Sequence, residues 1–224
     1  FSNLRKFDGK KLRKLNLSEI GQIAGRAGRY LNDGSFGITG DCKEINAEEV
    51  DLLENHKFEE IRTLFWRNSN LNFNNSLTLI KSLEERPQRE WLRKIHECED
   101  EKALKYFLRD KNFENVNFDS QTLNLLWECC QIPDFVKKTY GNHYNVIESV
   151  FKFLSSDKGK ITNEYMRLQL MKLDKLEGNV DSISNRIANV RTWSYVSNKN
   201  NWIENQDYWI EKTKLLEDKL SDRL

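Results

Sequence analysis

The sequence is poor in residues that interrupt secondary structure, and it has no long apolar run. Only two prolines occur in 224 residues. Both, Pro87 and Pro133, fall at boundaries between segments with helical periodicity, so the interiors of the expected helices are unbroken. No apolar run approaches the ~20 residues that span a bilayer, and no signal-peptide pattern is present. We therefore expect a globular protein with a hydrophobic core and no membrane partner.

Cysteine and histidine are also scarce, and their spacing fits no metal site. The seven residues are Cys42, Cys98, Cys129, Cys130, His56, His96 and His143. The cysteines form no C-x-x-C pair, and the histidines have no acidic or cysteine neighbour at ligand spacing. The sequence therefore predicts that no metal is bound and that the four thiols are reduced, as in a reducing compartment.

Neither sign of charge predominates in the whole chain. Its 36 basic and 35 acidic residues give a net charge of +1, which by itself indicates neither nucleic acid nor an acidic partner. The distribution is uneven, because residues 1–40 carry eight basic and three acidic side chains, a net charge of +5. The basic segment 5–14 could contact a phosphate backbone, or it could belong to a motor domain close to the nucleic-acid path. Both interpretations remain open.

Hydrophobic periodicity predicts a mainly helical protein with a small amount of strand at its start. Asp8-Gly9 between two short runs is typical of a β-hairpin formed by residues 3–7 and 10–15. Residues 35–39 alternate like a strand. Ser18 is the expected N-cap of the first helix, and Asn46 with Glu49 has the form of a capping box for the second. Helices are expected at 19–31, 46–55, 57–66, 75–85, 87–97, 99–110, 119–131 and 143–156.

The last third carries the most regular apolar pattern. Apolar residues recur at spacings of three and four, which predicts one long helix from about 162 to 196. They are Leu173, Leu176, Val180, Ile183, Ile187 and Val190. A polar break at 198–203 precedes a second helix from about 205. An antiparallel helical hairpin is favoured over a dimerising coiled coil, because fewer than four heptads are sustained.

One motif carries the chemistry of a phosphate site: Gln22-Ile-Ala-Gly-Arg-Ala-Gly-Arg29. On a helix, Gln22, Arg26 and Arg29 would share one face at i, i+4 and i+7. Gly25 and Gly28 would each cost about 1 kcal/mol inside a helix, so close approach of a backbone or a phosphate is expected there. Arginine stabilises the charge that develops in phosphoryl transfer. Ordinary surface ion pairs are the alternative, but the eight-residue pattern favours the functional interpretation.

At these residues the chain resembles motif VI of superfamily 2 helicases of the DExH type. Other segments resemble the degradosome RNA helicases of mitochondria and their bacterial relatives. They are Lys6-Phe-Asp-Gly9, Gly34-Ser-Phe-Gly-Ile-Thr-Gly40, Cys130-Gln-Ile-Pro-Asp134, the stretch 176–187, Arg191-Thr-Trp193 and the stretch 216–222. Together the matches cover most of the chain, and motif VI is the most specific of them.

The resemblance implies an ATP-driven motor that unwinds nucleic acid, with RNA the commoner substrate. Arg29 would take the arginine-finger position, Arg26 would make a second γ-phosphate contact, and Gln22 with Gly25 and Gly28 would couple nucleotide state to domain closure. ATP and Mg²⁺ are the cofactors implied for the full-length protein. This chain lacks a phosphate loop and a DExH box, so we expect it to bind no cofactor and to be inactive alone. We also expect the natural chain to extend upstream into the missing RecA-like domain.

A second group of residues could contact nucleic acid through the helical region. Arg191, Trp193, Lys199 and Trp202 place two tryptophans beside basic and amide side chains, and a base stacked on such a ring contributes about 1–3 kcal/mol. The alternative is that the tryptophans pack in the core, and it is favoured for each ring taken singly.

The sequence thus predicts a mainly α protein with three domains. They are the end of the second RecA-like domain at 1–45, a helical domain at 46–160 and a helical hairpin at 161–224. The expected function is the C-terminal part of an ATP-dependent RNA helicase, with an exoribonuclease as a candidate partner. A non-enzymatic helical adaptor is the alternative. The expected compartment is the bacterial cytoplasm, with the mitochondrial matrix as the alternative.

Overall fold

The computed structural model describes residues 1–8, 11–28, 33–40, 42–110, 113, 116–137 and 140–224. These residues form two compact units, Phe1–Leu64 (unit 1) and Phe65–Leu224 (unit 2). The chain is mainly α-helical, as predicted, and the described part contains two small two-stranded sheets. The three expected domains remain a prediction, and each unit is described here by itself. No helix among the described residues is long and apolar enough to cross a membrane.

Unit 1 begins with the expected hairpin. Strands β1 (Arg5–Phe7) and β2 (Leu12–Lys14) are antiparallel, with Phe7 opposite Leu12. The Asp8 amide donates to the Lys11 carbonyl (3.1 Å), while the Asp8 carboxylate accepts from the Lys11 amide (2.9 Å). These bonds close the connection, whose residues 9 and 10 lie outside the described ranges. Helices α1 (Leu17–Ala24) and α2 (Ala47–Glu54) pack against each other. The core is Leu4, Leu15, Ile20 and Leu53.

The N-caps show where the helices of unit 1 begin. Asn16, not Ser18, caps α1: its side chain accepts from the Glu19 amide (2.9 Å), and Glu19 accepts from the Asn16 amide (3.0 Å). The prediction of Ser18 was wrong because the side chain of Asn16, two residues earlier, already forms the capping box with Glu19. The capping box of Asn46 and Glu49 at α2 is confirmed.

Three expected elements are corrected. Segment 35–39 forms no strand. It makes two hydrogen bonds with the N-terminal residue: the Thr39 amide donates to the Phe1 carbonyl (2.9 Å), and the Phe1 ammonium donates to the Gly37 carbonyl (2.6 Å). Segments 57–66 and 87–97 are not helices. They contribute β3 (Leu64–Trp66) and β4 (Leu92–Lys94), which pair with each other. In β4 half-buried Leu92 and Lys94 alternate with exposed Arg93, which is the two-residue period of a strand.

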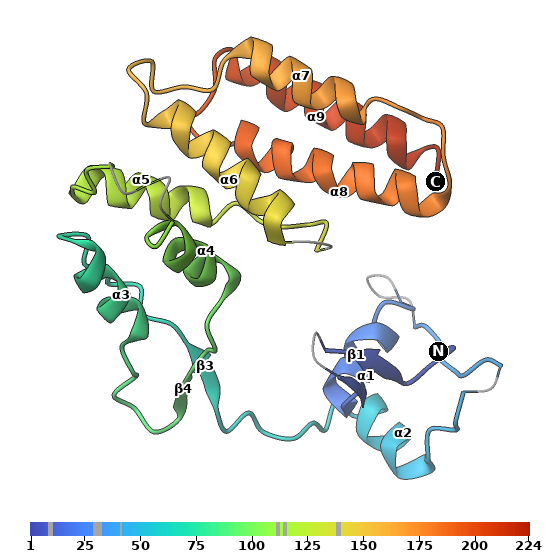
Figure 1. The fold of residues 1–224 in the computed structure, drawn as a ribbon. Coiled ribbons are helices and arrows are strands. Elements are labelled where there is room, and N and C mark those ends of the chain that lie inside the picture. The colour runs from blue at the N-terminus through green and yellow to red at the C-terminus, as the bar shows by residue number, and fades with distance from the viewer. Residues whose placement is uncertain (9–10, 29–32, 41, 111–112, 114–115, 138–139) are drawn as a thin grey trace. The chain divides into compact units, whose positions relative to one another are not determined.

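Seven helices of unit 2 lie in the described ranges. They are α3 (Ser76–Glu84), α4 (Glu99–Phe107), α5 (Ser120–Cys130), α6 (Tyr140–Leu154), α7 (Asn163–Leu173), α8 (Val180–Ser197) and α9 (Gln206–Ser221). The first four confirm the helices expected at 75–85, 99–110, 119–131 and 143–156. Helices α4, α5 and α6 pack in succession, as do α7, α8 and α9 (Figure 1).

The long helix expected from 162 to 196 is interrupted. Helix α7 ends at Leu173 and α8 begins at Val180, and Gly178 between them has φ +127°. Such a backbone favours glycine and cannot continue a helix. The Asn179 side chain then caps α8 by accepting from the Ser182 amide (2.9 Å). The apolar spacing of three and four runs across this break, which is why it suggested a single helix.

The hairpin of α8 and α9 is confirmed. Gln206 at the start of α9 donates to the Ser197 carbonyl at the end of α8 (3.0 Å), and Arg191 pairs with Glu217 (2.7 Å) further along. The two helices therefore run antiparallel, and Figure 1 shows them side by side.

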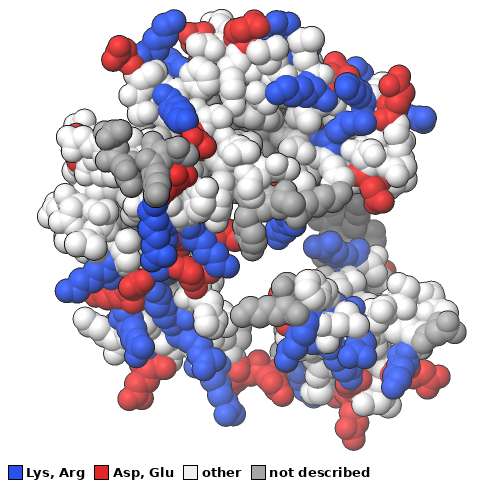
Figure 2. Space-filling model, viewed as in Figure 1, with Lys and Arg blue, Asp and Glu red and all other residues white. Residues whose placement is uncertain are grey.

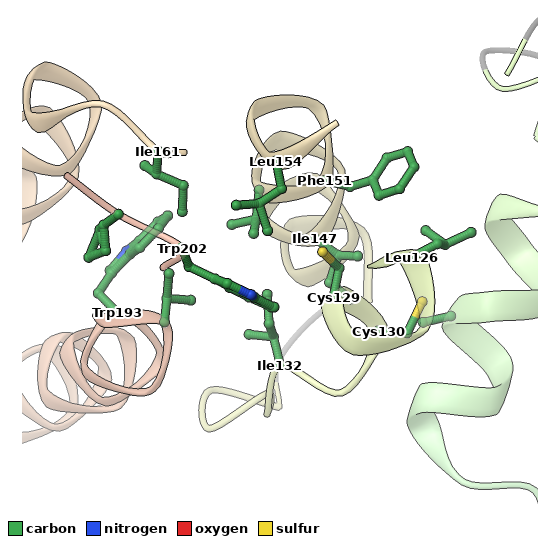
Figure 3. Packing of buried hydrophobic residues seen from close by; sticks show 14 of the residues in the cluster. Leu126, Cys129, Cys130, Ile132, Ile147, Phe151, Leu154, Ile161, Trp193 and Trp202 are labelled. Atoms are coloured by element: carbon green, nitrogen blue, oxygen red, sulfur yellow. The ribbon is translucent and has the colours of Figure 1, made fainter. Parts of the chain in front are cut away.

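The core of unit 2 is one continuous cluster that reaches from α3 to α9. Figure 3 shows part of it, including Cys129 and Cys130 of α5 and Ile147 and Phe151 of α6. Burial raises the pKa of both thiols, so they act as small apolar side chains rather than as nucleophiles.

The segment that precedes α7 pairs with the segment that precedes α9. Ile161 pairs with Ile203 in a parallel bridge: the Ile161 amide donates to the Trp202 carbonyl (2.8 Å), and the Glu204 amide donates to the Ile161 carbonyl (3.1 Å). The segment that enters α7 is thereby fixed to the segment that enters α9.

Candidate functional site

Helix α1, which leads into the arginine motif, is fixed to the hairpin by one carboxylate. Arg13 donates two bonds to Glu19, from Nη1 to Oε2 (2.8 Å) and from Nη2 to Oε1 (2.7 Å), and Lys6 Nζ lies 2.5 Å from Oε1. Hydrogen bonds from Arg13, from Lys6 and from the Asn16 amide hold the pKa of Glu19 well below its usual range. A bidentate pair of this kind fixes direction as well as distance, so the hairpin sets the orientation of α1.

The cations of the hairpin are therefore largely engaged within unit 1. Lys14 pairs with Glu49 at the start of α2 (2.9 Å), in addition to the pairs of Lys6 and Arg13 with Glu19. Figure 2 shows Lys and Arg side chains on the face of unit 1 that the view presents. Their pairing indicates that the hairpin's charge serves mainly to hold the unit together.

The motif itself begins on α1 and leaves it. Helix α1 ends at Ala24, and the Gly25 amide donates to the Gly21 carbonyl (2.9 Å). The next two amides make tighter bonds three residues back, from Arg26 to Ile23 (3.2 Å) and from Ala27 to Ala24 (2.9 Å). The expected helix 19–31 is thus wrong over residues 25–28, and residues 29–31 lie outside the described ranges.

The expected single face for the three polar residues is therefore corrected too. Gln22 lies on α1, Arg26 lies in the turns that follow it, and Arg29 lies outside the described residues. The spacing of i, i+4 and i+7 assumed continuous helix, and Gly25 ends that helix.

Arg26 and Gln22 are both exposed. Arg26 forms no ion pair with any residue that the structure describes. Gly25 is also exposed and Gly28 is half-buried. With respect to the described residues, the Arg26 guanidinium is therefore available to bind an anion, and its planar donors suit phosphate oxygens.

The chain returns across the motif at Gly34. A β-carbon built on Gly34 would lie 2.4 Å from both the Ala27 carbonyl carbon and the Gly28 amide nitrogen. The close backbone approach expected around the motif's glycines therefore occurs here, with Gly34 as the residue that must lack a side chain. Gly34 therefore lies directly beside the backbone of Ala27 and Gly28.

A hollow of about 610 Å³ lies at the start of unit 1. It is lined by residues 2–5 with Lys14 on one side and by residues 42–44 on the other. The structure places Arg5, Lys14 and Lys43 at this hollow, whereas Gln22 and Arg26 are not among its lining residues.

Of the four residues expected to form a nucleic-acid platform in unit 2, the two tryptophans are buried. Trp193 is 4% exposed and Trp202 is 6% exposed, and both lie in the core in Figure 3. These rings offer no face to a base, so the packing alternative holds for both. Arg191 is paired with Glu217 (2.7 Å), and Lys199 Nζ lies over the rings of Tyr195 (5.3 Å) and Trp202 (5.5 Å).

Sequence reasoning missed a more open aromatic group on α4. The Tyr106 ring is 47% exposed and lies against Tyr144, with centroids 4.7 Å apart. Lys102 and Arg109, at i−4 and i+3, line the same hollow of about 650 Å³ and form no ion pair with a described residue. The signal was the spacing Lys-x-x-x-Tyr, which places Lys102 and Tyr106 on one face of α4. Arg109 lies in the turn that follows the end of α4 at Phe107.

No group of three or more His, Cys, Asp or Glu side chains in the described ranges could hold a metal ion. Within those ranges the features that can act chemically are therefore the exposed arginine of unit 1 and the aromatic and basic face of α4.

Comparisons with known proteins relate part of the chain to helicases. A stretch of 53 residues is 49% identical to the mitochondrial ATP-dependent RNA helicase SUV3 of Oryza sativa subsp. japonica. The mitochondrial DExH-box ATP-dependent RNA helicase DExH16 of Arabidopsis thaliana is 47% identical over 53 residues. Each match covers 24% of this chain and 9% of the relative's length. No protein-family model matches the chain, and no solved structure matches it.

Proposed function

We propose that this chain is a C-terminal part of an ATP-dependent RNA helicase, with unit 1 supplying the arginine-bearing motif VI from the end of a RecA-like domain. The observation that carries the proposal is Arg26, an exposed arginine of a Gln-x-x-Gly-Arg-x-x-Arg motif that forms no ion pair with a carboxylate of the described residues. The 53-residue likeness to two ATP-dependent RNA helicases supports it.

The mechanism belongs to the whole protein. ATP and Mg²⁺ would be bound chiefly by a second RecA-like domain that carries the phosphate loop, because this chain has none. Closure of the two domains would bring Arg26 and Arg29 to the γ-phosphate, where they stabilise the negative charge of the transition state. Gln22, on the last turn of α1, would couple that closure to the state of the nucleotide. The close contact of Gly34 with Ala27 and Gly28 supports a fixed backbone directly after Arg26.

The experiment is RNA-stimulated ATP hydrolysis by the full-length protein carrying Arg26→Ala or Arg29→Ala. An arginine finger contributes about 10³-fold or more to turnover, so each variant should lose that factor while retaining nucleotide binding. Arg62→Ala, at an exposed arginine of unit 1 outside the motif, is the matched control. Wild-type turnover in both motif variants would favour the non-enzymatic adaptor instead.

We further propose that RNA contacts unit 2 at Lys102 and Tyr106 of α4 and at Arg109 in the turn after it. A base stacked on Tyr106 would be flanked by two cations that can approach the phosphates. Tyr106→Ala should weaken the binding of labelled single-stranded RNA about fivefold or more. Tyr208→Ala, at an exposed tyrosine of α9, should leave that affinity unchanged, and equal effects would contradict this site.

The compartment follows from the relatives rather than from the structure. Both matched helicases are named as mitochondrial, which supports the mitochondrial matrix over the bacterial cytoplasm. An exoribonuclease partner rests on the family resemblance alone.

A further inference from the structure

Helices α7 and α9 lie beside each other and run in the same direction. At their starts, the Trp209 indole Nε1 donates to Asn163 Oδ1 (2.8 Å). At their ends, Lys219 Nζ donates to Asp174 Oδ1 (2.6 Å). Because start meets start and end meets end, the two helices are parallel, and their facing surfaces are fixed at both ends.

A groove of about 350 Å³ lies between these helices. Its floor consists of Leu170, Trp209 and Leu216, which are buried. Two rows of side chains form its walls. They are Arg167, Met171 and Asp174 on α7, and Tyr208, Lys212, Leu215 and Lys219 on α9. Both rows follow the i, i+4, i+7 spacing of a single helical face.

The walls expose apolar side chains that the unit itself leaves uncovered. Met171, Tyr208 and Leu215 are 56%, 55% and 57% exposed. An apolar surface with a polar rim is typical of an interaction site. From Tyr208 to Lys219 the wall extends about 16 Å, or three helical turns. The groove therefore has the length and the row spacing that would accept a short amphipathic helix.

The charge of the rim indicates which kind of helix. The lining residues include three cations, Arg167, Lys212 and Lys219, and one carboxylate, Asp174. Arg167 is paired with Glu164, and Lys219 is paired with Asp174. Lys212 has no ion pair with any residue in the described part of the chain. The rim therefore keeps one cation without a partner among the described residues, Lys212, beside an apolar floor, and this arrangement is complementary to a carboxylate that flanks apolar anchors.

The geometry points to a docking site for an acidic amphipathic helix of a partner protein. Apolar side chains at i, i+4 and i+7 of that helix would contact Met171, Tyr208 and Leu215, and its carboxylates would reach Lys212. The site is independent of the arginine motif of unit 1.

The test uses the whole chain and a labelled 14-residue peptide with leucine at positions 1, 5, 8 and 12 and mostly glutamate elsewhere. A peptide with lysine in place of each glutamate and a scrambled peptide accompany it. Fluorescence anisotropy should show saturable binding of the acidic peptide below about 1 mM. Lys212→Glu should weaken that binding about tenfold and strengthen binding of the lysine peptide. Leu215→Ser should weaken binding of both.

Two matched control variants carry the same kinds of substitution outside the groove. Lys214→Glu changes an exposed lysine of α9 outside the groove, and Leu77→Ser changes an exposed leucine of α3. Neither should alter peptide affinity, and circular dichroism confirms that each variant is folded. The inference is overturned if the acidic peptide fails to saturate, or if Lys212→Glu weakens RNA binding rather than peptide binding. It is also overturned if the groove variants only dissociate a dimer of the chain without changing peptide affinity.

Discussion

Gly34 and Gly28 are in direct backbone contact: a β-carbon on Gly34 would stand 2.4 Å from the Gly28 amide nitrogen. Real β-carbons do not approach a backbone so closely, so Gly34→Ala must move one of the two segments. We expect it to lower the free energy of unfolding of unit 1 by about 1–3 kcal/mol, the usual cost of overpacking. Hydrogen exchange of the α1 amides measures this directly.

Gly37→Ala provides the comparison, because a β-carbon at Gly37 meets nothing within 4 Å. We expect its effect to stay within about 0.5 kcal/mol. Similar losses in the two variants would show that the Gly34 contact does not stabilise unit 1.

The ion pairs of Glu19 should make unit 1 sensitive to acid. Hydrogen bonds from Arg13 and Lys6 lower the pKa of Glu19 from its ordinary value of 4.5. The stabilisation is therefore complete above about pH 4.5 and is lost as the pH falls through the lower folded-state pKa. Glu19→Gln should be less stable than wild type near neutrality and should lose less on acidification. Protection of α1 amides, measured from pH 7 to pH 3, tests this. Glu48→Gln, at an exposed glutamate of α2, should follow the wild-type profile.

Arg67 of unit 2 forms ion pairs with the carboxylates of Asp100 and Glu101. It donates to both oxygens of Asp100 (2.8 and 3.1 Å), and its Nε lies 3.4 Å from Oε1 of Glu101. Glu101 is 1% exposed, its Oε1 accepts no hydrogen bond, and burial raises its pKa. Arg67→Met leaves these charges uncompensated and should cost about 3 kcal/mol of unfolding free energy.

The double variant Arg67→Met with Glu101→Gln separates charge from packing. Removal of the buried charge should recover part of the loss, giving a non-additive cycle in urea denaturation. Arg62→Met serves as a control without effect. A double variant no better than Arg67→Met alone would place the cost in the contact of Arg67 with the Trp127 ring, whose centroid is 5.1 Å away.

Substitution by alanine should lower the free energy of unfolding at one glycine of unit 2 and raise it at another. Gly178 has φ +127°, and a β-carbon there would lie 3.1 Å from the β-carbon of Ser182. Gly178→Ala should cost about 1–3 kcal/mol. Gly141 lies in the first turn of α6 with nothing within 4 Å of its β-carbon position, so Gly141→Ala should stabilise by up to about 1 kcal/mol. Thermal unfolding of both variants decides the signs.

The start of a helix was predictable where a nearby side chain caps it. The capping box of Asn46 and Glu49 depends on four consecutive residues, and it was correctly located from the sequence. The same reasoning missed Asn16 only because Ser18 also satisfies the general preference. Interruptions were harder to predict. The break at Gly178 and the end of α1 at Gly25 occur inside patterns whose apolar spacing continues, and spacing does not report a backbone angle.

Strands β3 and β4 show that pairing between distant segments was also not predictable from the sequence. They are three residues long each, and their pairing joins segments more than twenty residues apart, so a local window contains little of the information that fixes them. The candidate site likewise has a part that the sequence predicted and a part that it did not. The arginine motif could be recognised from its letters, whereas the burial of Trp193 and Trp202 and the exposure of Tyr106 depend on which helices pack together.

The bridge between Ile161 and Ile203 implies that unit 2 does not depend on an unbroken chain between α7 and α8. The bridge, the Trp209–Asn163 bond and the Lys219–Asp174 pair all join the part before residue 175 to the part after residue 200. A protease cut at 175–178 should therefore leave two fragments that stay associated and migrate together on a sizing column. The same connection should accept an inserted tag, so this loop is where the protein can be labelled without dismantling its helices.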